Sequence, residues 1–166
     1  MPQTLDPPAI RSLPGVIRVW APAQVALILE MGGHFSATHG GPPVVATAPG
    51  HAAWAGPGWL AATVAAHLEA HPGGAHLAAH PGCAMPRLVV DCGPDPGLAL
   101  AALRLGAKGV ALDAGPARPR LAALAATLGA EVVELVPPWL DLPDDAAAAR
   151  RALARFIGMD RGPPSR

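Results

Sequence analysis

Short apolar segments rich in β-branched residues recur along the chain, and most are followed by a segment with the spacing of a helix. The five apolar segments are residues 15–20, 42–49, 87–92, 109–114 and 130–136. Each is apolar on both faces, which is typical of strands in a parallel sheet with helices on either side. This alternation restricts the fold strongly, because consecutive parallel strands need a crossover connection between them.

The helical patterns cover residues 23–31, 59–71, 97–105, 118–128 and 144–156. Pro96 and Gly97 are typical of a helix start, whereas Gly106 and Gly129 are typical of helix ends. We therefore predict about five βα units forming an α/β fold with a parallel sheet. Two architectures fit this pattern: a partial TIM-barrel-like sheet with strands in sequential order, and an open Rossmann-like sheet.

The length of 166 residues is enough for one domain with its own core. We expect a flexible leader over residues 1–14, a single α/β domain over 15–157 and a disordered polar tail over 158–166.

The charge balance argues against a polyanionic partner. Twelve Lys and Arg residues face twelve Asp and Glu residues, so no net charge is available to gather phosphates, and we expect no nucleic-acid binding. No apolar stretch is long enough for a membrane span, and the first residues lack the pattern of an export signal. We expect a cytoplasmic protein whose two cysteines, Cys83 and Cys92, stay reduced.

Two aspartates stand at the ends of neighbouring predicted strands. Asp91 ends the third strand and Asp113 ends the fourth. In either architecture the carboxyl ends of the strands form the functional rim, so both carboxylates are candidates for ligand contacts. The alternative is structural, because an aspartate in a βα loop often caps the following helix.

The order of several segments resembles the first part of the class II, zinc-dependent fructose-bisphosphate aldolase family. The segments are "VWAPAQVALILEMG", "PPVVATAPGHAAWAG", "VVDCG", "ALRLGAKGVALDAG" and "LGAEVVELV", and they cover roughly residues 15–136. Each segment is a common βα phrase, and the resemblance rests on their order. It implies a barrel-like fold and, for a complete family member, aldol cleavage or condensation of sugar phosphates at a zinc ion.

The resemblance also implies roles for individual residues. Asp91 matches the family's proton-transferring acid/base, and Cys92 takes the place of a zinc-binding histidine, which a thiolate can replace chemically. Ala48 stands where the family has a serine near the substrate, and Glu134 lies only near its acid on the fifth strand. The family's other zinc histidines and its phosphate loop belong to later strands, which have no counterpart in this sequence.

Histidines elsewhere offer a second metal hypothesis. His67 and His71 are four residues apart on a predicted helix, and His76 and His80 repeat that spacing near Cys83. A structural zinc site is compatible with this spacing, although a set of surface histidines is the simpler explanation.

Two functional classes remain open. In the first, the chain is a shortened aldolase-like protein without the full catalytic machinery, acting as a binding or assembly module, with Asp113 and Glu134 as further rim ligand-binding residues. Open sheet edges would then favour a homo-oligomer or a protein partner. In the second, it is a metal-dependent lyase for sugar phosphates, with Asp91 as the catalytic residue, Cys92 on a zinc ion and the site completed by another subunit.

Overall fold

The computed structural model describes residues 10–13, 15–31, 42–70 and 85–157. Seven strands are formed within these ranges, and all are parallel to their neighbours. They are β1 (Arg11–Leu13), β2 (Val16–Val19), β3 (Val44–Thr47), β4 (Arg87–Asp91), β5 (Gly109–Ala111), β6 (Glu131–Leu135) and β7 (Trp139–Asp141). The prediction of an α/β protein with a parallel sheet is confirmed.

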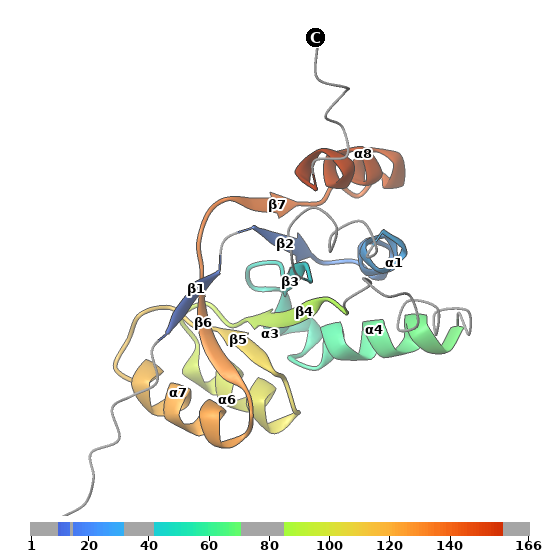
Figure 1. The fold of residues 1–166 in the computed structure, drawn as a ribbon. Coiled ribbons are helices and arrows are strands. Elements are labelled where there is room, and N and C mark those ends of the chain that lie inside the picture. The colour runs from blue at the N-terminus through green and yellow to red at the C-terminus, as the bar shows by residue number, and fades with distance from the viewer. Residues whose placement is uncertain (1–9, 14, 32–41, 71–84, 158–166) are drawn as a thin grey trace, which may run out of the picture.

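The strand order in the sheet is β1-β6-β5-β4-β3-β2-β7 (Figure 1). Strands β2 to β6 are the five strands expected from the sequence, and they lie side by side in sequential order. This is the order of a barrel arc, and among these five strands there is no reversal of the kind that creates a switch point in a doubly wound sheet.

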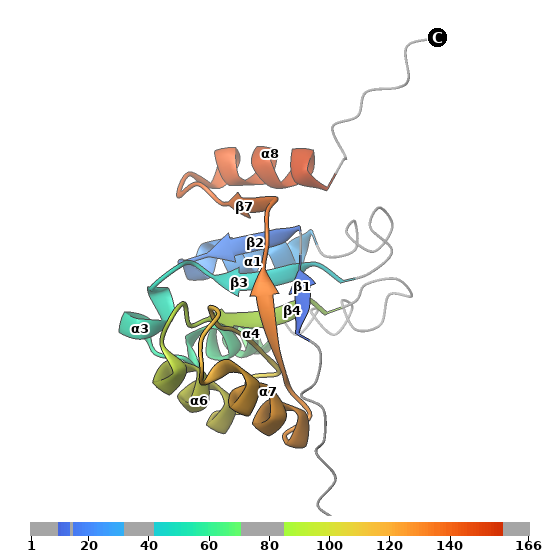
Figure 2. The ribbon, with the colours of Figure 1, turned by 90° about the vertical axis from the view of Figure 1, so that its left-hand side faces the viewer.

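The chain connections require the sheet to curl. β1 and β2 are five positions apart in the sheet, which would separate them by about 24 Å if the sheet were flat. Leu13 and Val16, however, are three residues apart and can be separated by at most ~11 Å. The sheet is therefore curled into a half-barrel, and β1 and β6 stand across the other strands in Figure 2.

A continuous backbone contact joins the two ends of this curled sheet. Leu13 of β1 pairs with Leu135 of β6, and Val16 of β2 pairs with Trp139 of β7. Val16 is three residues after Leu13, whereas Trp139 is four residues after Leu135, so the second segment contains one extra residue. The extra residue is taken up as a bulge, where Gly15 N donates to Pro138 O at 2.9 Å. Gly15 has a φ of 70°, a conformation that glycine adopts without strain. The two outermost strands, β1 and β7, are only three residues long.

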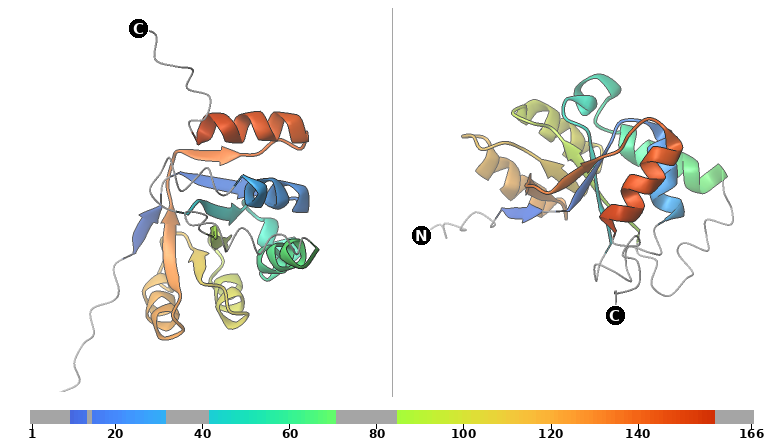
Figure 3. Two further views of the ribbon diagram at one scale, coloured as in Figure 1. Left: turned by 45° about the vertical axis from the view of Figure 1, so that its right-hand side comes forward. Right: turned by 90° about the horizontal axis from the view of Figure 1, so that it is seen from above.

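Helices cover the outer face of the curled sheet (Figures 1 and 3). Helix α1 packs against both α4 and α8, and α6 packs against α7. Their bounds are α1 (Pro22–Glu30), α3 (His51–Ala55), α4 (Trp59–Ala70), α6 (Pro96–Arg104), α7 (Arg118–Thr127) and α8 (Ala146–Phe156).

Three strand and helix elements were not expected from the sequence. Strands β1 and β7 are too short and too polar to show alternation, and β1 falls within the segment expected as a flexible leader. The short helix α3 lies in the connection after β3. The other leader residues, 1–9 and 14, and the expected tail, 158–166, lie outside the described residues.

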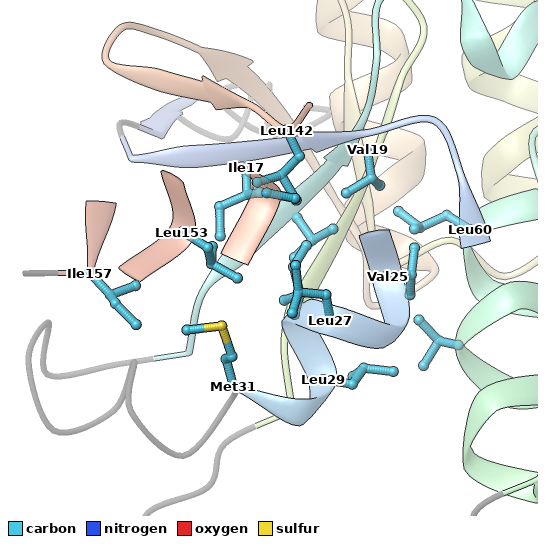
Figure 4. Packing of buried hydrophobic residues seen from close by; sticks show 14 residues of the cluster. Ile17, Val19, Val25, Leu27, Leu29, Met31, Leu60, Leu142, Leu153 and Ile157 are labelled. Carbon is cyan, nitrogen blue, oxygen red and sulfur yellow. The ribbon is translucent and has the colours of Figure 1, made fainter. Parts of the chain in front are cut away.

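Two apolar clusters lie between the sheet and the helices. The larger one joins β2, β3 and β7 to helices α1, α4 and α8, and Ile17, Leu29 and Leu153 are among its fully buried members (Figure 4). The second joins β4, β5 and β6 to α6 and α7, and alanines contribute much of it. These clusters explain why the helices stay on the outer face.

A third cluster comes from the strands alone, so it fills the inner face of the curled sheet. It consists of six aliphatic residues, and most of them are valine or alanine: Leu13, Val16, Ala46, Val89, Ala111 and Val133. At the amino ends of the strands, Arg87 of β4 forms an ion pair with Glu131 of β6. Gly109 of β5 is required nearby, because a Cβ there would lie 3.0 Å from the Leu88 carbonyl oxygen. The inner face is thus closed at one end, and its polar residues gather at the other.

Candidate functional site

A cavity of about 320 Å³ lies at the carboxyl ends of the strands. Its polar lining comes from four different strands or their ends: Arg18 of β2, Asp91 of β4, Asp113 just after β5, and Glu134 of β6. Trp139 of β7 and several aliphatic side chains complete the wall. The volume is at the lower end of the range of roughly 300–1,000 Å³ that small-molecule sites occupy.

The cavity contains three of the residues that the sequence singled out. Asp91, Asp113 and Glu134 all line it, although they are far apart in the sequence. The structural alternative for the two aspartates does not apply: Asp95 caps helix α6, accepting from Gly97 N and Leu98 N, and Ala117 precedes α7 without any side-chain cap. Asp91 and Asp113 are therefore available to face the cavity.

Backbone contacts fix the position of Asp91. Its own N–H donates to Thr47 Oγ1 at 2.8 Å, and its Oδ1 accepts from Gly93 N at 3.0 Å. The Gly93 carbonyl in turn accepts from Asp113 N at 2.8 Å, which ties the two strand ends together. The pair of carboxylates is thus held in place by the main chain.

Burial raises the pKa of the Asp91 carboxyl above its usual value, and the neighbouring charge of Asp113 raises it further. The hydrogen bond from Gly93 and the positive charge of Arg18 act in the opposite direction but do not cancel the effect of burial. Asp91 consequently keeps its proton up to a higher pH than an exposed aspartate does.

Arg18 is the main feature that the sequence reasoning missed. Its side chain is only 13% exposed, and its guanidinium lies 3.8 Å from the centre of the Trp139 ring, a cation–π contact. Asp141 is 3.8 Å away, beyond hydrogen-bond distance, and the buried Nε–H has no hydrogen-bond partner among the described residues. Arg18 could have been noticed because it is the single charge in an otherwise apolar strand, whereas nothing in the sequence marks Trp139.

A second arginine lies behind the rim. Arg118, the first residue of α7, is buried, and its Nη2 is 3.6 Å from Oε2 of Glu134. This distance is too long for a hydrogen bond, and both Nε and Nη2 of Arg118 are buried without one among the described residues. Glu134 thus stands between the cavity and a second guanidinium.

Cys92 lies in a different environment from Asp91. It is buried in the apolar cluster between the sheet and helices α6 and α7, and its Sγ donates to Val90 O at 3.5 Å. Burial, together with the charges of Asp91 and Asp95, raises the pKa of the thiol to about 12. A zinc ligand must be a thiolate, so these surroundings do not fit a metal site at Cys92. Within the described ranges, no three His, Cys, Asp or Glu side chains are grouped so as to hold a metal ion.

The histidine hypothesis falls largely on residues that are not described: His71, His76, His80 and Cys83 lie outside the described residues. A different histidine is buried after β3. His51 lies edge-on to Trp54 and Trp59, each with ring centres 4.3 Å from its own, and burial lowers the pKa of its imidazole. His51 does not line the strand-end cavity.

No family model matches this sequence, and no curated protein matches it. In the part of the chain that is described, no helix combines the length and apolar character needed to cross a bilayer.

Proposed function

We propose that this chain is an aldolase-like half-barrel that acts as a binding module for a small polar molecule in the strand-end cavity. The observation that carries the proposal is Arg18. Its guanidinium is largely withdrawn from water, is stacked on an aromatic ring and has an Nε–H that is unpaired among the described residues. Such a buried charge lowers the stability of the fold unless a bound ligand interacts with it.

The geometry favours a ligand with an anionic group for Arg18 and hydrogen-bond donors for the carboxylates. A guanidinium binds a carboxylate or phosphate through two parallel hydrogen bonds. The ionised forms of Asp91 and Asp113 can only accept hydrogen bonds, so the part of the ligand facing them must donate. The small volume limits the ligand to the size of a simple metabolite.

This function is tested by ligand-observed NMR with a set of small carboxylates and sugar phosphates. We expect at least one compound to bind the wild-type chain and to bind at least about tenfold more weakly to Arg18→Gln, because a charge-assisted hydrogen bond is lost. Arg104→Gln is the matched control, because Arg104 is exposed at the end of α6. Binding that survives Arg18→Gln unchanged would contradict the proposal.

A lyase is the second candidate, and the raised pKa of Asp91 is the observation that favours it. A carboxyl group whose pKa is raised by burial suits the acid/base role that the aldolase resemblance implies. In this case the chain cleaves a sugar phosphate, and Asp91→Asn abolishes the cleavage. Failure of the wild-type chain to release a carbonyl product from any sugar phosphate tested, with or without added zinc, would eliminate this candidate.

A homo-oligomer and a cytoplasmic location are two further proposals, and neither depends on ligand binding. A homo-oligomer was expected from open sheet edges, and the edges that remain are the three-residue strands β1 and β7. Light scattering on the purified chain measures its mass directly. A cytoplasmic location is compatible with the buried free thiol of Cys92.

A further inference from the structure

The charges around the strand-end cavity are unbalanced. Asp91, Asp113, Glu134 and Arg18 line it, and the Glu134 carboxylate lies beside Arg118 of helix α7. The next charges outward are Asp141, which is 3.8 Å from Arg18, and Arg118, which is 3.6 Å from Glu134. At the opening, the carboxylates of Asp91 and Asp113 thus outnumber the guanidinium of Arg18.

A purely anionic ligand would fit this arrangement poorly. Its negative charge would be attracted by Arg18 but would increase the repulsion among carboxylates that already interact unfavourably, as Asp91 and Asp113 do. A purely cationic ligand would be repelled by the guanidinium of Arg18, which has no carboxylate of the described residues within hydrogen-bond distance. The arrangement is satisfied by a molecule that carries both charges close together.

We propose that the cavity binds a free α-amino acid in its zwitterionic form, with the carboxylate on Arg18 and the ammonium group between Asp91 and Asp113. The inference rests on the ligand-binding function proposed above and names its ligand class. The ammonium group offers three donors to carboxylates that can only accept, and the ligand's carboxylate accepts from the guanidinium of Arg18.

The remainder of the cavity limits the ligand's side chain. Val133, Leu135 and Trp139 are the apolar residues of the lining against which the ligand's side chain would lie, and the volume of about 320 Å³ accommodates an α-amino acid with an aliphatic side chain. We therefore expect an amino acid with a short aliphatic side chain, such as alanine, valine or leucine.

The test compares pairs of compounds that differ in one group. L-Alanine, L-valine and L-leucine are titrated calorimetrically against lactate, 2-hydroxyisovalerate and 2-hydroxyisocaproate, which keep the carboxylate and side chain but carry a hydroxyl in place of the ammonium. The amides of the same amino acids remove the carboxylate charge, and the N-acetyl derivatives remove the ammonium. We expect each of these changes to weaken binding about tenfold or more, because each removes one charged hydrogen-bonding group.

Two variants assign the contacts. Asp113→Asn, at an exposed position, should abolish the preference for the amino acid over the hydroxy acid, whereas Arg18→Gln should weaken both. Glu69→Gln is the control, because Glu69 is an exposed carboxylate on helix α4. Circular dichroism and thermal unfolding of each variant separate loss of binding from loss of the fold.

The outcomes distinguish this inference from the function on which it rests. Hydroxy acids that bind as tightly as the amino acids, in a manner that needs Arg18, would overturn the zwitterion and leave the binding module intact. Amides or simple amines that bind as tightly as the amino acids, with no effect of Arg18→Gln, would overturn both the zwitterion and the proposed role of Arg18 in the binding module. Absence of binding by every amino acid, with sugar phosphates or other carboxylates bound instead, would also overturn the inference.

Discussion

Gln24 joins two parts of the chain that are far apart in sequence, and replacing it should destabilise the protein strongly. Its side chain is buried in α1, where Oε1 accepts from Trp20 N at 2.9 Å and from Ala21 N at 3.2 Å. Its Nε2 donates to Leu142 O at 2.9 Å and to Pro143 O at 3.4 Å. The residue therefore caps the start of α1 and holds the connection between β7 and α8 against it.

Gln24→Met keeps a similar length and volume but removes every one of these hydrogen bonds. A well-formed hydrogen bond contributes about 1 kcal/mol, and a buried polar group left unpaired costs roughly 1–3 kcal/mol. In the variant, water can least easily replace the lost hydrogen bond at the Leu142 carbonyl, because Leu142 is fully buried. Trp20 N and Ala21 N are partly accessible and can bond to water. We expect the free energy of unfolding to fall by about 2–4 kcal/mol.

The assay is equilibrium unfolding in urea followed by circular dichroism. Glu30→Ala serves as the control, because the ion pair of Glu30 with Arg150 lies at the surface and is worth only about 0–1 kcal/mol. A loss below about 1 kcal/mol in Gln24→Met would show that the buried hydrogen bonds are not what joins the two segments.

Three further predictions concern the site and the sheet. Because the pKa of Asp91 is raised in the folded chain, its ionisation opposes folding as the pH rises. Asp91→Asn should therefore melt at a higher temperature than wild type at pH 7, and the difference should vanish below pH ~4. A lower melting temperature of the variant at pH 7 would contradict this. With its pKa near 12, the Cys92 thiol of a Cys83→Ser variant should resist Ellman's reagent at pH 8 until denaturant is added, so rapid labelling of the folded chain would show that the thiol is accessible. Gly109→Ala should lower the free energy of unfolding by about 1–3 kcal/mol, measured in urea, because the added methyl meets the Leu88 carbonyl; unchanged stability would mean that β4 and β5 adjust freely.

The prediction of the fold succeeded where the signal is local. Strands β2 to β6 were each expected within a few residues of their observed bounds, because β-branched apolar runs such as the one around Val89 and Val90 specify buried strands. β1 and β7 were missed because three-residue strands carry no periodicity; they are strands only because the sheet curls far enough to pair them.

The prediction of the site was partial for a related reason. Asp91, Asp113 and Glu134 were selected because strand ends in a parallel sheet converge on one rim, and the cavity is lined by all three. Arg18 and Trp139 were missed, because their contact depends on β2 pairing with β7 across the curled sheet. Cys92 follows Asp91 directly, yet it lies in the cluster beneath the helices, since successive strand residues point to opposite faces.

The sequence by itself determined the alternation of strands and helices and the position of acidic residues at strand ends, since both follow from local spacing and chain direction. Only the tertiary structure decided that the sheet curls until β1 meets β6 and β7 meets β2. That curvature goes with the packing: the inner face holds only a small apolar cluster that includes Ala46 and Ala111, and the largest cluster lies under helices α1, α4 and α8. Through it, Arg18 and Asp91 come to line one cavity, and the chemistry of the site depends on this shared position.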